Sequence, residues 1–239
     1  GPLDDGDSLY AVHIGLDHPT GEIVAGVGGF LAVSGFEAAF TGTPAHAGAH
    51  PEEGDNAIQA MAEAITSMYA IPRHADGPTR VNAGVVEGGT ASNIIAEEAR
   101  MECEVRGQTT ELMEYMWEET GGVVDAAADM HDVAAERTRN SRAPSAESDG
   151  ELAAVVADVA DGVEGVDSVM DHDDLGGSED ATFLMNRVQE QGGNACYVGL
   201  GTDHPGGHHT STFDVDEESL RIGVETLAGA IVALGETQG

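Results

Sequence analysis

The spacing of apolar residues divides this chain into helices and strands. Between residues 56 and 70, the side chains of Ile58, Met61, Ile65 and Met68 stand three or four positions apart, which is the spacing of one helical face. Shorter apolar runs predict strands instead. The predicted strands are residues 10–15, 30–42, 79–86, 99–107, 133–139 and 195–201, and the predicted helices are residues 56–70, 110–130, 151–163, 179–191 and 217–234.

The order of these elements predicts two domains. Over residues 30–142 the order is strand, helix, strand, strand, helix, strand, which is typical of a ferredoxin-like α+β domain. Residues 143–239 alternate helices with a buried-looking strand, which favours an α/β domain. Residues 1–29 are expected to belong to that same α/β domain. Because no cap or helix precedes the strand at residues 10–15, we expect the chain to start inside that domain.

The last predicted helix has a pattern of its own. The side chains of Leu220, Val224, Leu227 and Ile231 fall on one side of it, and Leu234 continues the same side, which is typical of an amphipathic helix. Asp214, three positions before Glu217, predicts a capping box where this helix begins.

Charge indicates the conditions in which this fold has to be stable. The chain has 44 acidic and nine basic residues, all nine of them Arg, and its formal net charge is −35. In molar salt the Debye length falls to about 3 Å, so the repulsion among the carboxylates is screened. An acidic disordered chain is the alternative, but 41% of the residues are apolar and they fall in periodic blocks. We therefore expect a folded halophilic protein.

The same totals exclude two kinds of partner. Nucleic acid requires a basic face, which this chain cannot supply. No apolar run approaches about 18 residues and no signal-peptide pattern is present, so we expect no membrane association. Cys103 and Cys196 lie far apart in strand-like segments and are expected to be buried thiols of a reducing cytoplasm, although a bridge between them stays open.

Histidine is the residue type that offers the most candidate chemistry. His13 lies in an apolar strand, where it is either a structural core histidine or a metal ligand. His208 and His209 follow two glycines in a loop from a strand to a helix, where α/β sites gather, so they are candidate metal ligands. His46 stands in a loop ahead of a helix and by itself indicates only an exposed histidine.

Charged side chains add fewer candidates. The cluster at residues 171–174 looks like a metal site, but such clusters are expected by chance in so acidic a chain. Glu179 and Asp180 stand where a helix begins and are either site residues or favourable first-turn charges. Arg106 closes a strand, either as one half of an ion pair or as a clamp for a substrate carboxylate.

Five segments, taken in order, resemble a single family. They are GTPAHAGAHPEEGDNAIQAMAEA, TRVNAGVVEGGTASNIIAEEA, ECEVRG, GGSEDATFLMNRVQEQGG and GTDHPGGHHTSTFDVDEE. Together they are similar to the amidohydrolase branch (subfamily D) of the M20 metallopeptidases over essentially the whole chain. The resemblance implies an α/β catalytic domain, here partial (residues 1–29 and 143–239), with an inserted α+β ferredoxin-like lid that also dimerises (residues 30–142).

The resemblance also implies a site with two divalent metal ions, zinc or manganese. His13 and His209 match two of the family's metal ligands. Glu179 and Asp180 match a motif near the metals, and their expected role is to orient a ligand.

In the lid, the resemblance implies three further site residues. His46 matches a histidine that reaches the site of the partner copy and polarises the scissile carbonyl. Asn93 and Arg106 match positions that hold the carboxylate end of the substrate.

The implied activity is hydrolysis of the amide bond of N-acyl amino acids, such as aminobenzoyl-glutamate, by attack of metal-bound water. The family's general base and its other ligands are expected upstream of residue 1, so the chain alone is expected to be inactive. The expected partner is a second copy that dimerises through the lid, or a hetero-subunit that supplies the missing half. The alternative is a non-catalytic remnant that dimerises and binds a carboxylate without cutting it.

Overall fold

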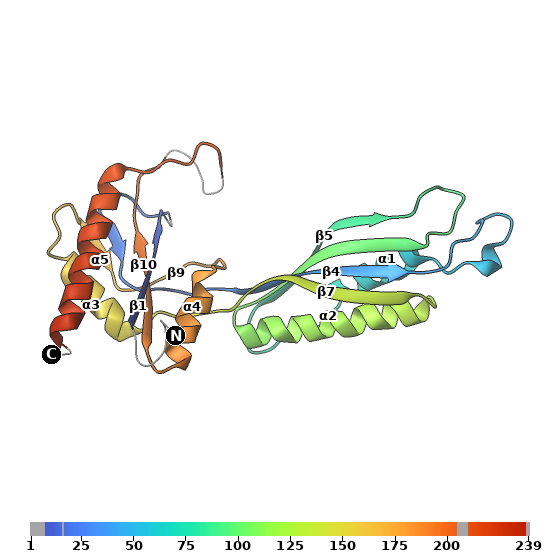
Figure 1. Cartoon of the computed structure of the whole chain (residues 1–239), viewed down its shortest axis with the longest axis horizontal. Coiled ribbons are helices and arrows are strands. Elements are labelled where there is room, and N and C mark those ends of the chain that lie inside the picture. Colours follow the sequence, from blue (N-terminus) through green and yellow to red (C-terminus); the bar gives the residue numbers. More distant parts are fainter. Residues whose placement is uncertain (1–7, 16, 205–209, 238–239) are drawn as a thin grey trace. The chain divides into compact units, whose positions relative to one another are not determined.

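The chain divides into two compact units of mixed helices and strands (Figure 1). The structure, a computed structural model, describes residues 8–15, 17–204 and 210–237. We call Leu31–Ser145 the inserted unit, and Gly1–Phe30 together with Ala146–Gly239 the interrupted unit. Within the described ranges, no helix is long and apolar enough to cross a membrane.

The inserted unit is a four-stranded antiparallel sheet in the order β5-β6-β4-β7, with two helices on one face. Its elements are β4 (Ala32–Thr41), the 3-10 helix η1 (Pro51–Glu53), α1 (Ala57–Tyr69), β5 (Thr79–Gly88), β6 (Glu98–Gly107), α2 (Thr110–Met130) and β7 (Ala134–Ala143). Two strand-helix-strand units interlock in this order, so the predicted ferredoxin-like arrangement is confirmed.

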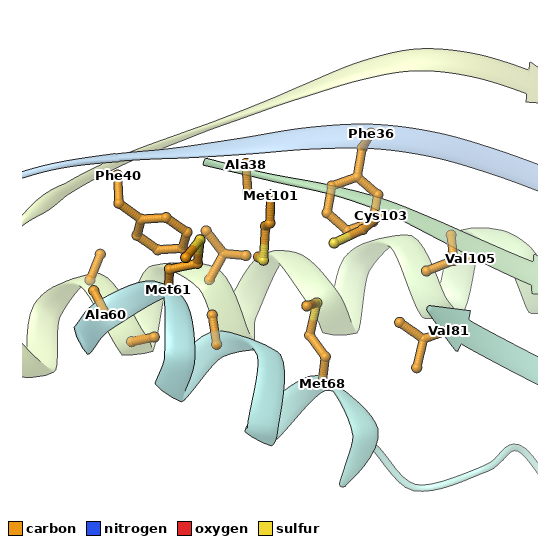
Figure 2. Packing of buried hydrophobic residues seen from close by; sticks show 14 of the residues in the cluster. Phe36, Ala38, Phe40, Ala60, Met61, Met68, Val81, Met101, Cys103 and Val105 are labelled. Carbon is orange, nitrogen blue, oxygen red and sulfur yellow. The ribbon is translucent and has the colours of Figure 1, made fainter. Parts of the chain in front are cut away.

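The core of the inserted unit forms because side chains alternate along its central strands. In β4, Phe36 and Phe40 face the helices and are buried, whereas Glu37 between them faces the opposite side of the sheet. Met61 and Met68 of α1 fill the space beneath these rings (Figure 2). The opposite face of the sheet therefore carries the charged residues of the central strands.

The interrupted unit is built on a mixed sheet in the order β1-β10-β2-β8. In it β1 (Ser8–Ile14) runs parallel to β10 (Asn194–Leu200). The other elements are β2 (Glu22–Val24), β3 (Val27–Gly28), α3 (Gly150–Ala160), β8 (Ser168–Met170), β9 (Asp173–Asp174), α4 (Ala181–Glu190) and α5 (Glu217–Thr237). Helices α3 and α5 pack on one face of the sheet, and α4 packs on the other.

Two local predictions can be compared with the structure. Asn56 is the N-cap of α1, because its side chain accepts a hydrogen bond from the N–H of Ile58 at 3.0 Å. At the start of α5, however, Asp216 rather than Asp214 accepts a backbone N–H from the first turn, that of Glu218 at 3.0 Å. The Asp214 carboxylate is turned instead to the N–H of the next residue, so the capping-box prediction was wrong. Both cysteines are buried and free, in different units, as predicted.

Glu114 on α2 anchors the edge strand β7. Its carboxylate accepts hydrogen bonds from both terminal nitrogens of Arg139, at 3.1 and 2.8 Å, and lies 2.9 Å from Arg142. The Arg139 guanidinium also lies 4.1 Å from the ring centroid of Trp117. The hydrogen bond from Arg139 is the main reason that the pKa of Glu114 is lowered.

We expect Glu114→Gln to lower the free energy of unfolding at pH 7 by about 1 kcal/mol or less, since the ion pairs are partly exposed. Because the pKa of Glu114 is lowered in the folded state, its contribution is present above the unfolded value of about 4.3 and is lost as the pH falls through the folded value. Thermal unfolding at pH 7 and pH 3 measures this. The control is Glu119→Gln on the same helix, and an equal loss for Glu114→Gln at both pH values would contradict the prediction.

Candidate functional site

The carboxyl ends of β1 and β10 lie side by side, because the strands are parallel and paired from Ser8↔Asn194 to Ile14↔Leu200. His13 is therefore opposite Gly199 at this edge of the sheet. The segment that leaves β10 toward α5 starts from the same edge, where sites of α/β sheets gather. His209 belongs to that segment but lies outside the described residues, so its assignment as a metal ligand stays a prediction.

His13 is held in one orientation by its own strand. Its Nδ1 lies 2.8 Å from the carbonyl oxygen of Ile14, and because a carbonyl only accepts, this hydrogen bond assigns the proton to Nδ1. The other ring nitrogen, Nε2, lies 3.7 Å from Oε1 of Glu179. Imidazole nitrogen and carboxylate oxygen are both donors that zinc and manganese accept. The donor set at His13 and Glu179 therefore fits a divalent metal.

Tyr197 belongs to the same group of side chains, although the sequence analysis did not indicate it. It is buried on β10, its ring centroid lies 6.5 Å from that of His13, and its hydroxyl is hydrogen-bonded to Glu179. Burial, followed by the charge and hydrogen bond of Glu179, raises the pKa of Tyr197. The phenol is thus a neutral donor that holds the Glu179 carboxylate. The available signal was a tyrosine in an otherwise aliphatic strand, since a buried tyrosine hydroxyl usually has a partner.

Asp180 has a different position from Glu179. It occupies the N-cap of α4, and its side chain makes no capping hydrogen bond. Glu179 instead precedes the helix and directs its carboxylate toward His13 and Tyr197. The two neighbours in sequence therefore do not share one role.

The acidic cluster at residues 171–174 is not gathered into a ligand set. Asp173 accepts from His18 Nε2 at 3.0 Å, and the other nitrogen of that ring lies 2.9 Å from Glu22 Oε1. His18 thus joins three segments of the interrupted unit, a role that no spacing in the sequence indicated. Among the described residues, one group has three ligand atoms close enough for a single ion, and its members are the exposed His50, Glu52 and Glu53.

His46 and Asn93 lie on two adjoining loops at one end of the inserted unit. The N–H of Ala47 donates to the carbonyl oxygen of Asn93 at 2.9 Å, which joins these loops. His46 Nδ1 accepts the N–H groups of Gly48 and Ala49, both at 3.1 Å, so the neutral ring carries its proton on Nε2. An exposed imidazole Nε2–H is a donor suited to a carbonyl oxygen of a ligand.

Arg106 lies at the other end of the same sheet. The loop of Asn93 leads into β6 at Glu98, and Arg106 is eight positions further along, from 98 to 106, or roughly 26 Å in a strand. Its Nε donates to Oε1 of Glu104 at 2.6 Å, and both side chains are partly exposed. One copy of the inserted unit therefore brings His46 and Asn93 together but keeps Arg106 apart from them.

A pocket of about 630 Å³ lies beside the Asn93 loop, between strands β4, β5 and β6. Its lining includes one cation, Arg100, and the carboxylates of Glu87, Glu97 and Glu98. Arg100 donates a hydrogen bond to Glu87 at 2.7 Å, so its positive charge is already paired with a carboxylate of the chain. The pocket is consequently acidic in balance, and it does not suit the carboxylate end of a substrate.

Comparison with known proteins identifies the domain type of the inserted unit. Residues 32–129 match the family model of the peptidase dimerisation domain of the M20 type. The chain therefore carries an M20 peptidase dimerisation domain.

Two curated relatives match almost all of this chain. One subunit of the p-aminobenzoyl-glutamate hydrolase of Escherichia coli (strain K12) is 39% identical over 240 residues, which are 100% of this chain and 55% of the relative. The indole-3-acetyl-aspartic acid hydrolase of Enterobacter agglomerans is 40% identical over 230 residues, 95% of this chain and 52% of the relative. This chain thus spans about half the length of the curated relatives that it matches.

Solved structures agree with the fold. The aminobenzoyl-glutamate utilization protein from Klebsiella pneumoniae is 34% identical with a TM-score of 0.82, over 94% of this chain and 54% of that one. A dinuclear metal binding peptidase of the M20 family from Bacillus subtilis, 22% identical, has a TM-score of 0.75 over 97% of this chain and 58% of that one. The predicted fold class, a partial α/β domain with an inserted α+β dimerisation domain, is confirmed.

We expect Tyr197→Phe to lower the free energy of unfolding by about 1 kcal/mol at pH 8, because a buried hydrogen bond to a carboxylate is lost. The raised pKa of Tyr197 means that its contribution is complete below the unfolded value of about 10 and declines as the pH rises toward the folded value. The difference between the two proteins should therefore shrink between pH 8 and pH 11, as measured by thermal unfolding. Tyr115→Phe is the control, and a difference that stays constant with pH would contradict this assignment.

Proposed function

We propose that this chain is the lid and C-terminal part of a metal-dependent amidohydrolase of the M20 peptidase family. The observation that carries the proposal is the identity of 39–40% with two hydrolases over 95–100% of this chain. The names of both relatives join an aromatic acyl group to an acidic amino acid, glutamate or aspartate. We propose the same substrate class here, N-acyl amino acids whose side chain and α-carbon both carry a carboxylate.

His13 and His209 would be ligands of two divalent metal ions, zinc or manganese. The ions would lower the pKa of a bound water and polarise the scissile carbonyl. The donor types at His13 and Glu179 support this, as does the dinuclear protein of the same fold. The part played by Tyr197 would be to orient the Glu179 carboxylate toward His13, since groups behind the ligands fix their geometry.

His46 would stabilise the negative charge that develops on the carbonyl oxygen of the substrate. Two backbone N–H groups occupy its Nδ1, so Nε2–H is the atom that would donate to that oxygen. Because those two hydrogen bonds fix the ring before a substrate arrives, little reorganisation would be needed.

The separation of roughly 26 Å between Arg106 and the loops of His46 and Asn93 bears on how the site is assembled. We propose that Arg106 of one copy and Asn93 of another hold the substrate's carboxylates, with His46 supplied alongside Asn93. An exposed ion pair such as Arg106–Glu104 contributes little in water, so a substrate carboxylate can replace Glu104 at small cost.

Homodimerisation through the inserted unit would bring such copies together. Exposed apolar side chains gather on α1 and on the edge strand β5, and they are Ile58, Tyr69, Val85 and Val86. The Escherichia coli relative is named as one subunit of its hydrolase, which also supports a partner of a different sequence. The excess of carboxylates, with no Lys in the chain, supports a role in a cytoplasm of molar salt.

The proposed activity is tested in the complete enzyme with manganese or zinc in molar KCl. Arg106→Ala should raise the apparent KM for p-aminobenzoyl-glutamate by about 10- to 100-fold, because a charge-assisted hydrogen bond is lost. The KM for the corresponding diamide, which has no free carboxylate, should change little.

The control for this experiment is Arg80→Ala, since Arg80 is paired in register with Arg106 on the neighbouring strand. If Arg106→Ala raised the KM equally for both substrates, Arg106 would not bind the carboxylate of the substrate. Substrate binding without any hydrolysis by the metal-loaded complete protein would favour the non-catalytic alternative.

The proposed dimer is tested by Val86→Asp, which places a charge on the exposed apolar surface of β5. Sedimentation in molar KCl should change from dimer to monomer, because the carboxylate would have to be desolvated in the interface. Met130→Asp, at another exposed apolar position of the inserted unit, should leave the dimer intact. A Val86→Asp protein that sediments as a dimer, like the parent, would show that this surface is not the dimer interface.

A further inference from the structure

The pocket of about 630 Å³ in the inserted unit, which we call the Arg100 pocket, contains a guanidinium whose edges are already hydrogen-bonded. Nε and Nη2 of Arg100 donate to Oε2 of Glu87 at 3.1 and 2.7 Å, and Nη1 donates to Oε2 of Glu37 at 3.5 Å. The Arg100 side chain nevertheless remains 51% exposed. A guanidinium that is held by its edges keeps its planar faces for another partner, and such faces stack on aromatic rings.

Small residues beside Arg100 leave room for a ring. In the antiparallel register, Arg100 is directly opposite Ala39 of β4 on one side and Glu87 of β5 on the other. Directly opposite residues share a face of the sheet, so the methyl group of Ala39 lies on the same face as the guanidinium. Gly88 and Gly89, which also line the pocket, add no side chains. The volume of the pocket lies within the range of about 300–1,000 Å³ that is usual for small-molecule sites.

Carboxylates make up the other polar part of the lining. Glu98 stands two positions before Arg100 on β6, so both side chains project from the outer face of the sheet, roughly 7 Å apart along the strand. Glu87 is engaged by Arg100, whereas Glu97 and Glu98 are exposed. A carboxylate only accepts hydrogen bonds. The Arg100 pocket therefore suits an aromatic group that carries an N–H donor and disfavours an anionic group.

The Arg100 pocket adjoins the loops of His46 and Asn93. Ile94, which lines the pocket, follows Asn93 directly and pairs with His46 in an isolated antiparallel bridge. The Cα atoms of two residues paired in this way are about 5 Å apart. Pro44, two positions before His46, lines the pocket as well. A carbonyl group that accepts a hydrogen bond from His46 would thus have its substituent within reach of the pocket.

We propose that the Arg100 pocket is the subsite for the acyl group of the substrate, and that it selects an aromatic acyl group with an N–H donor, such as aminobenzoyl. The ring would stack on the guanidinium of Arg100, and Glu98 would accept the hydrogen bond from the N–H group. Arg100 and Glu98 would then set the preference for the acyl group, whereas Asn93 and Arg106 bind the amino-acid end. This assignment rests on the proposed function, which defines the acyl group.

Binding is measured with 4-aminobenzamide, the acyl part of the proposed substrate without its amino acid. It is titrated into this chain in molar KCl, and the backbone amide signals of pocket residues such as Thr41, Thr90 and Ala99 should shift in NMR spectra. Arg100→Met, which keeps the length of the side chain but removes the guanidinium, should weaken the dissociation constant about three- to tenfold. Ala39→Leu, which fills the pocket from its exposed side, should abolish detectable binding.

Two further ligands separate the ring from its N–H donor. Cyclohexanecarboxamide, which has no aromatic face, should bind at least about tenfold more weakly than 4-aminobenzamide. Benzamide, which lacks the amine, should bind about two- to tenfold more weakly, and Glu98→Met should remove that difference because the acceptor is lost.

The matched control is Arg80→Met. Arg80 is exposed on the same face of the sheet, but it is opposite Arg106, six positions along β6 from Arg100, or roughly 20 Å away. This variant should leave the dissociation constant of 4-aminobenzamide within about twofold of the parent value. Thermal unfolding of the Arg100→Met and Ala39→Leu proteins should match that of the parent, because both changes lie on the outer face of the sheet.

Absence of binding, or binding that is indifferent to Arg100→Met and Ala39→Leu, would overturn the inference. In an active complete enzyme, an equal rise in KM for benzoyl-glutamate and acetyl-glutamate on Arg100→Met would also overturn it and would leave the proposed function standing. Conversely, binding of 4-aminobenzamide that Arg100→Met weakens, in a complete enzyme that hydrolyses no N-acyl amino acid, would support an aromatic site in this pocket and count against the proposed function.

Discussion

The parallel pairing of β1 with β10 is the constraint on which the rest of the structure depends. It joins residues that are 186 positions apart, from 8 to 194, across the whole of the inserted unit. Closing so long a loop costs conformational entropy, which grows slowly with length and has to be offset by the buried contacts of β10. The pairing also places His13 near Tyr197, and the segment just before α4 brings Glu179 close to both of them.

The inserted unit was predictable because its strands are ten residues long and β6 alternates over its whole length, so the period of two is measurable. β2 and β9 of the interrupted unit have three and two residues, which is too short for any period, and they were not predicted. The start of α5 was predicted at the wrong aspartate, since Asp214 and Asp216 are equally good caps in sequence and only the chain's path selects between them.

The candidate site could be predicted in composition but not in geometry. The resemblance to M20 proteins indicated His13 and Glu179 separately, whereas their approach to 3.7 Å follows from tertiary packing. Tyr197 carries no motif, and its role depends on a hydrogen bond to a residue on another element. The resemblance implied that His46 reaches the site of a partner copy, and the length of β6 adds that His46 and Arg106 lie at opposite ends of one sheet.

The proposed dimer would give this separation a physical explanation. A strand of ten residues cannot be shortened to bring Arg106 to the His46 loop, so a site that uses both has to draw them from different copies. In α5, Ile222 and Ala230 occupy the side of the helix that faces the core, so Leu220, Val224 and Ile231 remain exposed in the single chain. The surplus of carboxylates would keep such surfaces soluble before assembly, and molar salt would both screen their repulsion and strengthen the burial of apolar side chains that assembly requires.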